Sequence, residues 1–435
     1  MATQPDRGTQ DDAMVTSWRE KREGVIAPEE RLPWGQSLVA GLQHVVAMFG
    51  ATVLAPILMG FDPNVAILFS GIGTLIFFFA VGGHVPSYLG SSFAFIGAVI
   101  AVTGYGGQGP NAALGVALCG IVAAGVVYTA IGIAVIRTGT AWIEALMPPV
   151  VTGAIVAVIG LNLAPIAVQG LSRGGIETWV GLITVVAIGF VAVAAPGMLR
   201  RLPILLGGIA GYVVYFLVAN LLGLAAPIDF ARVAAAPWLG APSFTAPSFS
   251  FAAIAQIAPV AIVLVAENLG HVKAIGAMLG RDLDRFLGRA FVGDGVATII
   301  AGAAGGTGVT TYAENMGVMA VTKIYSTLVF LIAAAIAILL GFSPKFGAVI
   351  QTIPGPVLSG VSVVVFGLIA ATAGRIWVQN AVDFSDPRNL VTVAATLTIG
   401  AGNLSVNLFG FALGGIGTAT FGCILLYQLL RPRGG

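Results

Sequence analysis

Two carboxylates occur in stretches of the sequence that are otherwise apolar. Glu314 lies in GVTTYAENMGVMAVTK, residues 308–323, and Glu267 lies in AIVLVAENLGHVKAIG, residues 261–276. An acid at bilayer depth is costly, and acids inside membrane spans usually mark a functional site. We therefore expect both side chains to face one polar cavity within a membrane.

The polar residues beside these acids indicate how they are supported. His271 follows Glu267 by four residues, so the two share one helical face. His271 would support or tune Glu267, or the two would pair with each other as packing. Asn315 would bind a ligand or, as we favour, hold the backbone of an opposing strand. Asp294, flanked by glycines, would hydrogen-bond across helices or titrate.

The composition is that of a polytopic membrane protein. Of the 435 residues, 57% are hydrophobic and 9% are charged, whereas soluble proteins carry about 25% charged residues. The net charge of +2 is too small to indicate nucleic-acid binding. Cys119 and Cys423 lie in apolar runs, which favours small core residues over a disulfide or a metal site. No HExxH or GxSxG motif indicates an enzyme.

Apolar segments of membrane-spanning length recur along the chain, so the predicted fold is all-α. Two are short and rich in Ser, Thr and Gly before their helical part, namely 89–104 and 308–323. The fourteen predicted segments are 36–58, 64–82, 89–104, 111–136, 146–168, 177–196, 203–224, 252–278, 289–305, 308–323, 325–342, 347–370, 388–402 and 408–430.

The basic residues predict the orientation. Residues 1–33 are polar and lack the apolar core of a signal peptide, so we expect a disordered cytoplasmic tail. With the N-terminus inside, the outer loops carry only Arg173, Arg232 and Lys345. This bias places both termini on the cytoplasmic side, and the expected location is a bacterial inner membrane. The inner loops and C-terminus then carry Arg137, Arg200, Arg201, Arg281, Arg285, Arg289, Lys323, Arg375, Arg388, Arg431 and Arg433.

The two halves of the sequence resemble each other. SSFAF from Ser91 recurs as TTYAE from Thr310, and PVVTG from Pro149 recurs as PVLSG from Pro356. Seven segments per half is an odd number, so the second copy would be inverted in the membrane. A 7+7 inverted repeat with paired interrupted segments is typical of secondary transporters.

The two short segments should meet at the centre of the protein. Extended backbone at membrane depth needs hydrogen-bond partners, and a short antiparallel ladder between residues 89–104 and 308–323 would supply them. The helices that follow would direct their positive N-terminal ends at the cavity. Gln43 and His44 correspond in the repeat to Glu267 and Asn268. They would belong to the same polar interior, His44 as a satisfied core residue or a proton relay.

The predicted cavity suits one kind of ligand. Two carboxylates disfavour an anion and can accept hydrogen bonds from several N–H donors. A flat heterocyclic amide such as uracil offers two N–H donors and two carbonyl acceptors. Desolvation disfavours the charged form of a buried acid, so an acid beside the ligand would also suit proton coupling.

The motifs resemble those of the nucleobase–ascorbate transporter family, also called nucleobase/cation symporter-2. The resemblance covers 34–430 and rests on ENMGVMAVTK from Glu314, the pair Gln43-His44, the SSFAF run and the AENLGH segment. Within the family the sequence is most similar to bacterial uracil and pyrimidine permeases, especially the pyrimidine permease of the alternative pyrimidine-degradation pathway.

The resemblance implies a core domain (34–136 and 252–342), a gate domain (141–224 and 346–430), proton symport by an elevator-like motion, and a homodimer. It implies no cofactor besides the coupling proton. The substrate would be uracil, with thymine or xanthine as further candidates. A purine, xanthine or urate transporter, or an anion transporter or channel of the same architecture, are the alternatives.

The resemblance also implies roles for single residues. Glu267 and Glu314 would bind the base, His271 would assist, and Phe93 and Ala313 would contribute backbone groups. Uracil permeases have Gly in place of Ala313 and His in place of Asn268, so the pocket would be reshaped at these two positions. Purine members carry Gln in place of Glu314, which favours a pyrimidine here.

Overall fold

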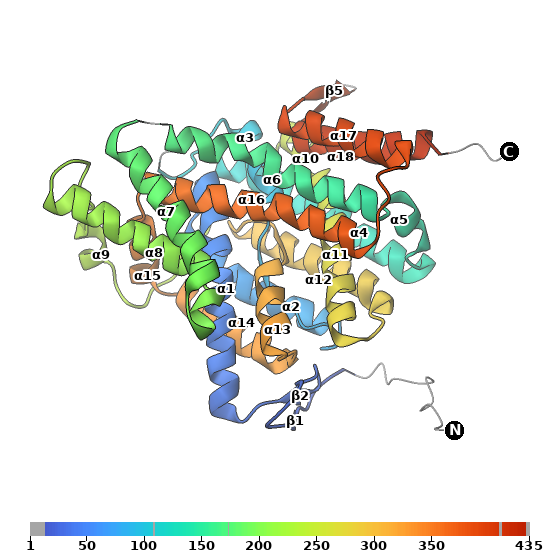
Figure 1. Ribbon diagram of the computed structural model, residues 1–435, viewed down its shortest axis with the longest axis horizontal. Helices are drawn as coiled ribbons and strands as arrows, with labels where there is room; N and C mark the ends of the chain where they lie inside the picture. The colour runs from blue at the N-terminus through green and yellow to red at the C-terminus, as the bar shows by residue number, and fades with distance from the viewer. Residues whose placement is uncertain (1–13, 108, 173, 409–410, 432–435) are drawn as a thin grey trace.

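Long apolar helices make up most of the structure, a computed structural model that describes residues 14–107, 109–172, 174–408 and 411–431 (Figure 1). Nine helical spans in these ranges are long and apolar enough to cross a membrane, or ten if α14 and α15 count as one bent span. The chain is therefore a multi-pass membrane protein. The nine are α1 (Trp34–Met59), α2 (Pro63–Ala80), α4 (Leu114–Thr138), α6 (Pro149–Leu171), α7 (Gly175–Ala194), α8 with a π-helical turn (Pro203–Leu221), α10 with α11 (Phe251–Leu279), a 3-10 turn with α12 (Asp284–Ala303) and α16 (Gly355–Gln379).

Shorter helices complete the bundle. The predicted segment 347–370 is misplaced, because Pro354 and Pro356 end one helix and begin the next. The chain instead forms α15 and then α16, and α14 and α15 meet at a bend of 82°. The remaining helices are α3 (Ala94–Thr103), α5 (Ala141–Leu146), α9 (Ala231–Ala235), α13 (Ala313–Thr322), α14 (Thr327–Gly341), α15 (Pro344–Gln351), α17 (Pro387–Ala401) and α18 (Gly415–Leu429).

Two very short strands cross at the centre, as the sequence predicts. Strand β3 (Leu89–Ser91) pairs antiparallel with β4 (Val309–Thr311), and all six residues are buried. Each strand leads directly into a half-length helix, α3 or α13. At Gly90 a Cβ atom would lie 2.4 Å from the Tyr312 ring, so only glycine fits this crossing.

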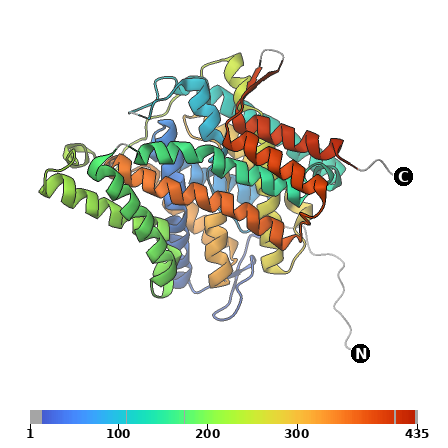
Figure 2. The ribbon, with the colours of Figure 1, turned by 45° about the horizontal axis from the view of Figure 1, so that its top comes forward.

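The helices pack in pairs through glycine contacts. Helices α6 and α16 lie side by side, as do α4 and α12, and α2 and α14 (Figures 1 and 2). At Gly125 and Gly295 a Cβ atom would approach the facing backbone to 2.8 and 2.6 Å, so these residues permit the close contact of α4 and α12. Cys119 and Cys423 are free thiols, as expected.

The N-terminal region departs from the predicted disorder. Residues 1–13 lie outside the described residues, but 14–33 form β1 (Arg19–Glu20) and β2 (Glu30–Arg31), a parallel pair. This segment contacts α2 and the start of α14. Sequence polarity misses such order, because it depends on backbone partners far away in the chain. The segment predicted at 408–430 also begins later, after the hairpin of β5 (Val406–Leu408) and β6 (Phe411–Leu413).

Candidate functional site

The two acids come from different elements and share one site. Glu267 lies midway along α11 (Val260–Leu279), and Glu314 lies in the first turn of α13. Both side chains are half-buried, and α11 contacts both α13 and the strand β4 that precedes it. The sequence prediction that these acids face a common space is consistent with this arrangement. One Glu267 oxygen, Oε2, is buried without a hydrogen-bond partner in the described part of the chain.

His271 connects α11 to the strand crossing. Its Nδ1 atom lies 2.9 Å from Thr311 Oγ1 on β4. No hydrogen bond joins His271 to Glu267 among the described residues. The alternative in which these two residues only pair with each other is therefore not what the structure shows. His271 fixes the position of α11 relative to β4 and leaves the Glu267 carboxylate available.

A buried polar cluster lies behind Glu267. The Asn268 amide donates to Asp294 Oδ2 at 2.7 Å and to the Tyr128 hydroxyl at 2.9 Å, and all three residues are fully buried. Asp294 on α12 thus hydrogen-bonds across helices, one of the two roles expected from sequence. Its second oxygen, Oδ1, has no partner in the described ranges. The cluster ties α4, α11 and α12 together directly beside the acidic site.

The start of α13 leaves backbone donors available. Tyr312 precedes the helix and provides no side-chain cap, and Ala313 is exposed. Uncapped N–H groups at a helix N-terminus can bind carbonyl or anionic oxygens. The Tyr312 hydroxyl turns back to the crossing, donates to the Ser91 carbonyl at 2.9 Å and accepts from Thr52 at 3.3 Å. These two bonds fix the Tyr312 side chain between β3 and α1, directly before Ala313.

Asn315 holds α1 rather than the opposing strand, which corrects the preferred sequence interpretation. Its Nδ2 atom lies 3.0 Å from His44 Nδ1 and donates to the His44 carbonyl at 3.1 Å. The His44 ring also packs on Phe330 at 4.5 Å between centroids. Asn315 Oδ1 and Gln43 Nε2 are buried and unpartnered within the described residues. His44 is thus a satisfied core histidine.

Phe93 directly precedes α3 and faces α16. It is 7% exposed, and its ring meets that of Phe366 on α16 edge-to-face at 5.9 Å. A Cβ atom at Gly97, one turn further, would lie 3.3 Å from Asn162 Oδ1 on α6. This is where the helix pair α6–α16 meets the half-helix α3.

Several contributors to this site do not follow from the sequence reading. They are Thr52, Tyr128, Thr311, Tyr312 and Phe366. Thr311 and Tyr312 carry a local signal, because they directly precede the Ala313-Glu314 pair. Thr52, Tyr128 and Phe366 are linked to the site by contacts between residues more than 30 positions apart, which no local pattern reveals.

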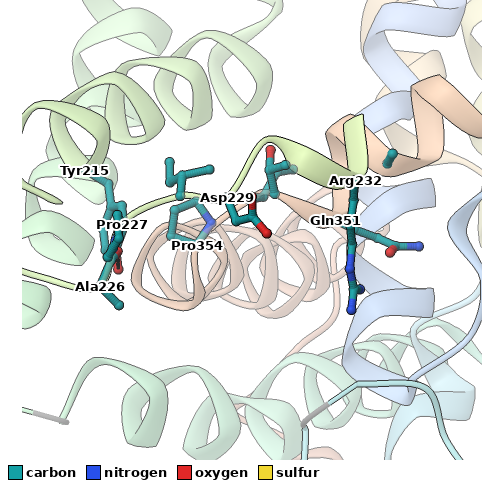
Figure 3. A pocket seen from close by; sticks show the side chains of 11 residues that line it. Tyr215, Ala226, Pro227, Asp229, Arg232, Gln351 and Pro354 are labelled. Carbon is teal, nitrogen blue, oxygen red and sulfur yellow. Dashed lines mark hydrogen bonds between the residues drawn. The ribbon is translucent and has the colours of Figure 1, made fainter. Parts of the chain in front are cut away.

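Two cavities lie away from the acidic site. One of about 400 Å³ is lined by the loop after α8 and by the α15–α16 break, including Tyr215, Asp229, Arg232 and Gln351 (Figure 3). A second of about 190 Å³ shares Gln351 and adds Asp62. None of the residues lining either cavity belongs to the acidic site.

Comparison with known proteins decides the family. The family model described as "Permease family" matches residues 35–409. The chain belongs to this family. The nucleobase–ascorbate transporters indicated by the motifs are thereby confirmed, and the protein is a transporter rather than an enzyme.

Relatives and one solved structure extend this result. The chain is 61% identical over 410 residues to "Putative pyrimidine permease RutG" of Escherichia coli K12, which covers 94% of this chain and 93% of the relative. It is 41% identical over 418 residues to the uracil permease of Paenibacillus larvae, with 93% and 96% covered. The transmembrane domain of the cyanobacterial bicarbonate transporter BicA shares the fold, with a TM-score of 0.61, 16% identity, and 90% and 97% covered.

Proposed function

We propose that this permease imports uracil or a related pyrimidine nucleobase across the bacterial inner membrane together with protons. The observation that carries the proposal is the acidic site itself. The Glu267 and Glu314 carboxylates share one space beside the uncapped N-terminus of α13, and Glu267 Oε2 has no partner in the described residues. The printed names of the relatives, pyrimidine permease and uracil permease, support the same substrate class.

The chemistry of the base matches the site. The two N–H groups of uracil would donate to the carboxylates of Glu267 and Glu314, and its carbonyls would accept from backbone N–H groups near Phe93 and Ala313. Charge-assisted hydrogen bonds of this kind are the strong ones. His271 would keep α11 in register with β4. Thymine and xanthine are further candidates for the same donor and acceptor pattern.

Coupling would use protons and no other cofactor. In this proposal a proton is taken up at the acidic site with the base, and Glu267, His271 and Asp294 are the candidate carriers. Gln43 and His44 would support the site from α1, and Asn315 would support it from α13. Buried acids on a transport path commonly form such relays.

Two alternatives use the same architecture. A purine, xanthine or urate transporter would need the site to accept a larger ring, and Glu314 disfavours this reading because the family resemblance links Gln to purines. An anion transporter or channel has the support of a shared fold with a bicarbonate transporter. Two adjacent carboxylates would repel an anion, so this alternative is the weaker one.

The proposed architecture is fourteen segments in a 7+7 inverted repeat. Segments 1–7 are α1, α2, α3, α4, α6, α7 and α8, and segments 8–14 are α10–α11, α12, α13, α14, α16, α17 and α18. If each segment is replaced by its counterpart in the other half, the α4–α12 contact becomes the α14–α2 contact. The same replacement turns α7–α8 into α17–α18, and α7–α16 into α17–α6, and both members of each pair occur. The β3–β4 and α6–α16 contacts map onto themselves. This correspondence supports the repeat independently of the sequence matches.

The same contacts support two moving domains. Segments 1–4 and 8–11 pack mainly among themselves, as do segments 5–7 and 12–14. We propose that the first group is a core that carries the base and the second a gate, with an elevator-like motion between them. Both termini would be cytoplasmic, and the protein would act as a homodimer.

Uptake into proteoliposomes tests the proposal. Labelled uracil, thymine and xanthine would be offered under separate proton and sodium gradients. We expect saturable uracil uptake driven by the proton gradient. Absence of uracil uptake, or strict dependence on sodium, would reject the function as stated, and preferential xanthine uptake would favour the purine alternative.

A further inference from the structure

The half-helix α13 is weakly packed along its length. Of its ten residues only Asn315, Val318 and Met319 are buried, and Val321 is 57% exposed. A Cβ atom added at Gly317 would meet nothing within 4 Å. A helix this short is not stable alone. Its position therefore depends on contacts with other elements, and β4 together with the Asn315–His44 bonds holds its first turn.

The N-terminal segment holds the second end. The Ile26 N–H donates to the Lys323 carbonyl at 3.0 Å, and the Tyr325 N–H donates to the Ile26 carbonyl at 2.8 Å. These bonds form a parallel bridge between Ile26 and Ile324, and the Ile26 side chain is 1% exposed. Figures 1 and 2 both show the N-terminal strands beneath the end of α13.

The same segment reaches the end of α11. Glu29 accepts two hydrogen bonds from the Arg281 guanidinium, at 2.6 and 3.0 Å. Arg281 lies two residues beyond α11, the helix that carries Glu267. Between these two contacts, the Pro28 carbonyl accepts from both the N–H and the hydroxyl of Thr327 at the start of α14, at 3.1 and 2.9 Å.

Glu30 makes this segment rigid. It is 5% exposed, and its carboxylate accepts from Arg19, from Lys21 and from the Ala27 N–H, at 3.1, 3.0 and 2.9 Å. A loop fixed by three bonds to one buried acid loses little further freedom when it binds its neighbours. It can therefore transmit position from one helix end to another.

We propose that residues 26–30, the N-terminal clasp, position the substrate site by fixing the end of α13 relative to the end of α11. The clasp thereby sets the separation of Glu314 and Glu267, although it touches neither acid. It would remain closed throughout transport, because all the contacts described above run to elements of the proposed core. This inference rests on the proposed role of the two acids in substrate binding.

Substitution of Glu29 tests the clasp in the full-length protein. We expect Glu29→Gln to raise the Kd and KM for uracil about three- to fivefold, as for loss of a partly exposed ion pair, with no change in maximal rate. The charge-reversed pair Glu29→Arg with Arg281→Glu should recover part of the affinity. Glu23→Gln, at an exposed acid of the same segment, is the matched control. Wild-type affinity in Glu29→Gln, or a lower maximal rate at unchanged KM, would overturn the proposal.

Hydrogen exchange separates the clasp from the substrate assignment. Glu29→Gln should speed exchange of the amides of 313–322, and Glu23→Gln should not. If the wild-type protein fails to bind uracil but this difference in exchange persists, the substrate is wrong and the clasp stands. Unchanged exchange in 313–322 would reject the clasp whatever the substrate.

A cross-link tests whether the clasp must open. Cysteines at positions 26 and 324, introduced as Ile26→Cys and Ile324→Cys, would join the two bridge partners on oxidation. We expect equal uptake by the oxidised and the reduced forms of this variant. Loss of uptake on oxidation, with recovery on reduction, would show that the segment opens during transport and would overturn its role as a fixed positioning element.

Discussion

The half-helices α3 and α13 share one construction and differ in chemistry. Each follows a three-residue strand of the central ladder, and each ends in a left-handed residue, Gly104 or Lys323. At the position corresponding to Glu314, α3 carries Phe95, which is fully buried. The Phe95 ring packs directly against Gly308, where a Cβ atom would clash with the ring. In the proposed repeat, one copy thus supplies packing, and the other supplies the carboxylate.

In the proposed repeat, this difference makes an asymmetric site from two similar halves. The paired strands and the short helices that follow them occur in both halves. The acid and the amide, Glu314 and Asn315, occur only in the second copy, where α3 has Phe95 and Ile96. Specificity can therefore change in α13 without loss of the packing that α3 provides.

The largest expected effect is at the acid. Glu314→Gln should weaken uracil binding about 10- to 100-fold, since a charge-assisted hydrogen bond is lost, while thermal stability in detergent stays near that of wild type. Phe95→Leu should do the reverse and cost about 1 kcal/mol of stability with little effect on the Kd. Equal effects of the two variants on binding would contradict the division of roles.

The tether to α1 comes next. Asn315→Ala removes both bonds to His44 and leaves its buried groups unpaired, which should cost about 1–3 kcal/mol of stability. Uracil affinity should fall with it. Asn380→Ala provides the control, because that exposed amide, directly after α16, donates to the Ile376 carbonyl of the same helix. Similar melting temperatures for the two variants would show that the His44 contact is not important for stability.

A smaller effect is expected at the entry to α13. Tyr312→Phe makes this position like its counterpart Phe93, and it removes the bonds to Ser91 and Thr52. We expect uracil binding to weaken by about 1 kcal/mol, measured as a several-fold rise in the Kd for uracil. Thr52→Val deletes only the weaker bond and should have less effect. A larger loss from Thr52→Val would assign the role to the α1 contact instead.

The helix ends should respond in opposite directions. Gly104→Ala places a side chain at a φ of 64° and should destabilise by about 1 kcal/mol. Lys323→Gly relieves a φ of 57° and should be neutral or slightly stabilising, because glycine adopts this conformation without strain. Melting curves of the two variants measure this, and destabilisation by both would indicate that the Lys323 side chain is itself needed.

The smallest expected effect concerns pH. Hydrogen bonds from Arg281 lower the pKa of Glu29 below its usual value. The contribution of this ion pair is therefore present above the usual glutamate pKa and is lost as the pH falls through the lowered one. Between about pH 5 and 8 it should be constant. Uptake in Glu29→Gln should keep the wild-type pH profile in this range, and an altered profile would connect the clasp to proton coupling.

The sequence by itself determined the class of the protein and the chemistry of its site. Composition and segment length indicate a polytopic helical membrane protein, and the motifs around Glu267 and Glu314 identify the family. The strand pairing also follows, since extended backbone in a membrane has few ways to satisfy its hydrogen bonds. These conclusions need only local pattern and the cost of burying polar groups.

The tertiary structure decided which groups meet. Asn315 bonds to His44 and not to the opposing strand, His271 bonds to Thr311 and not to Glu267, and residues 26–30 are ordered against the ends of α11 and α13. Each of these contacts joins residues at least 40 positions apart. The energies of such contacts depend on distance and direction between side chains, which hydropathy and spacing along the chain do not contain.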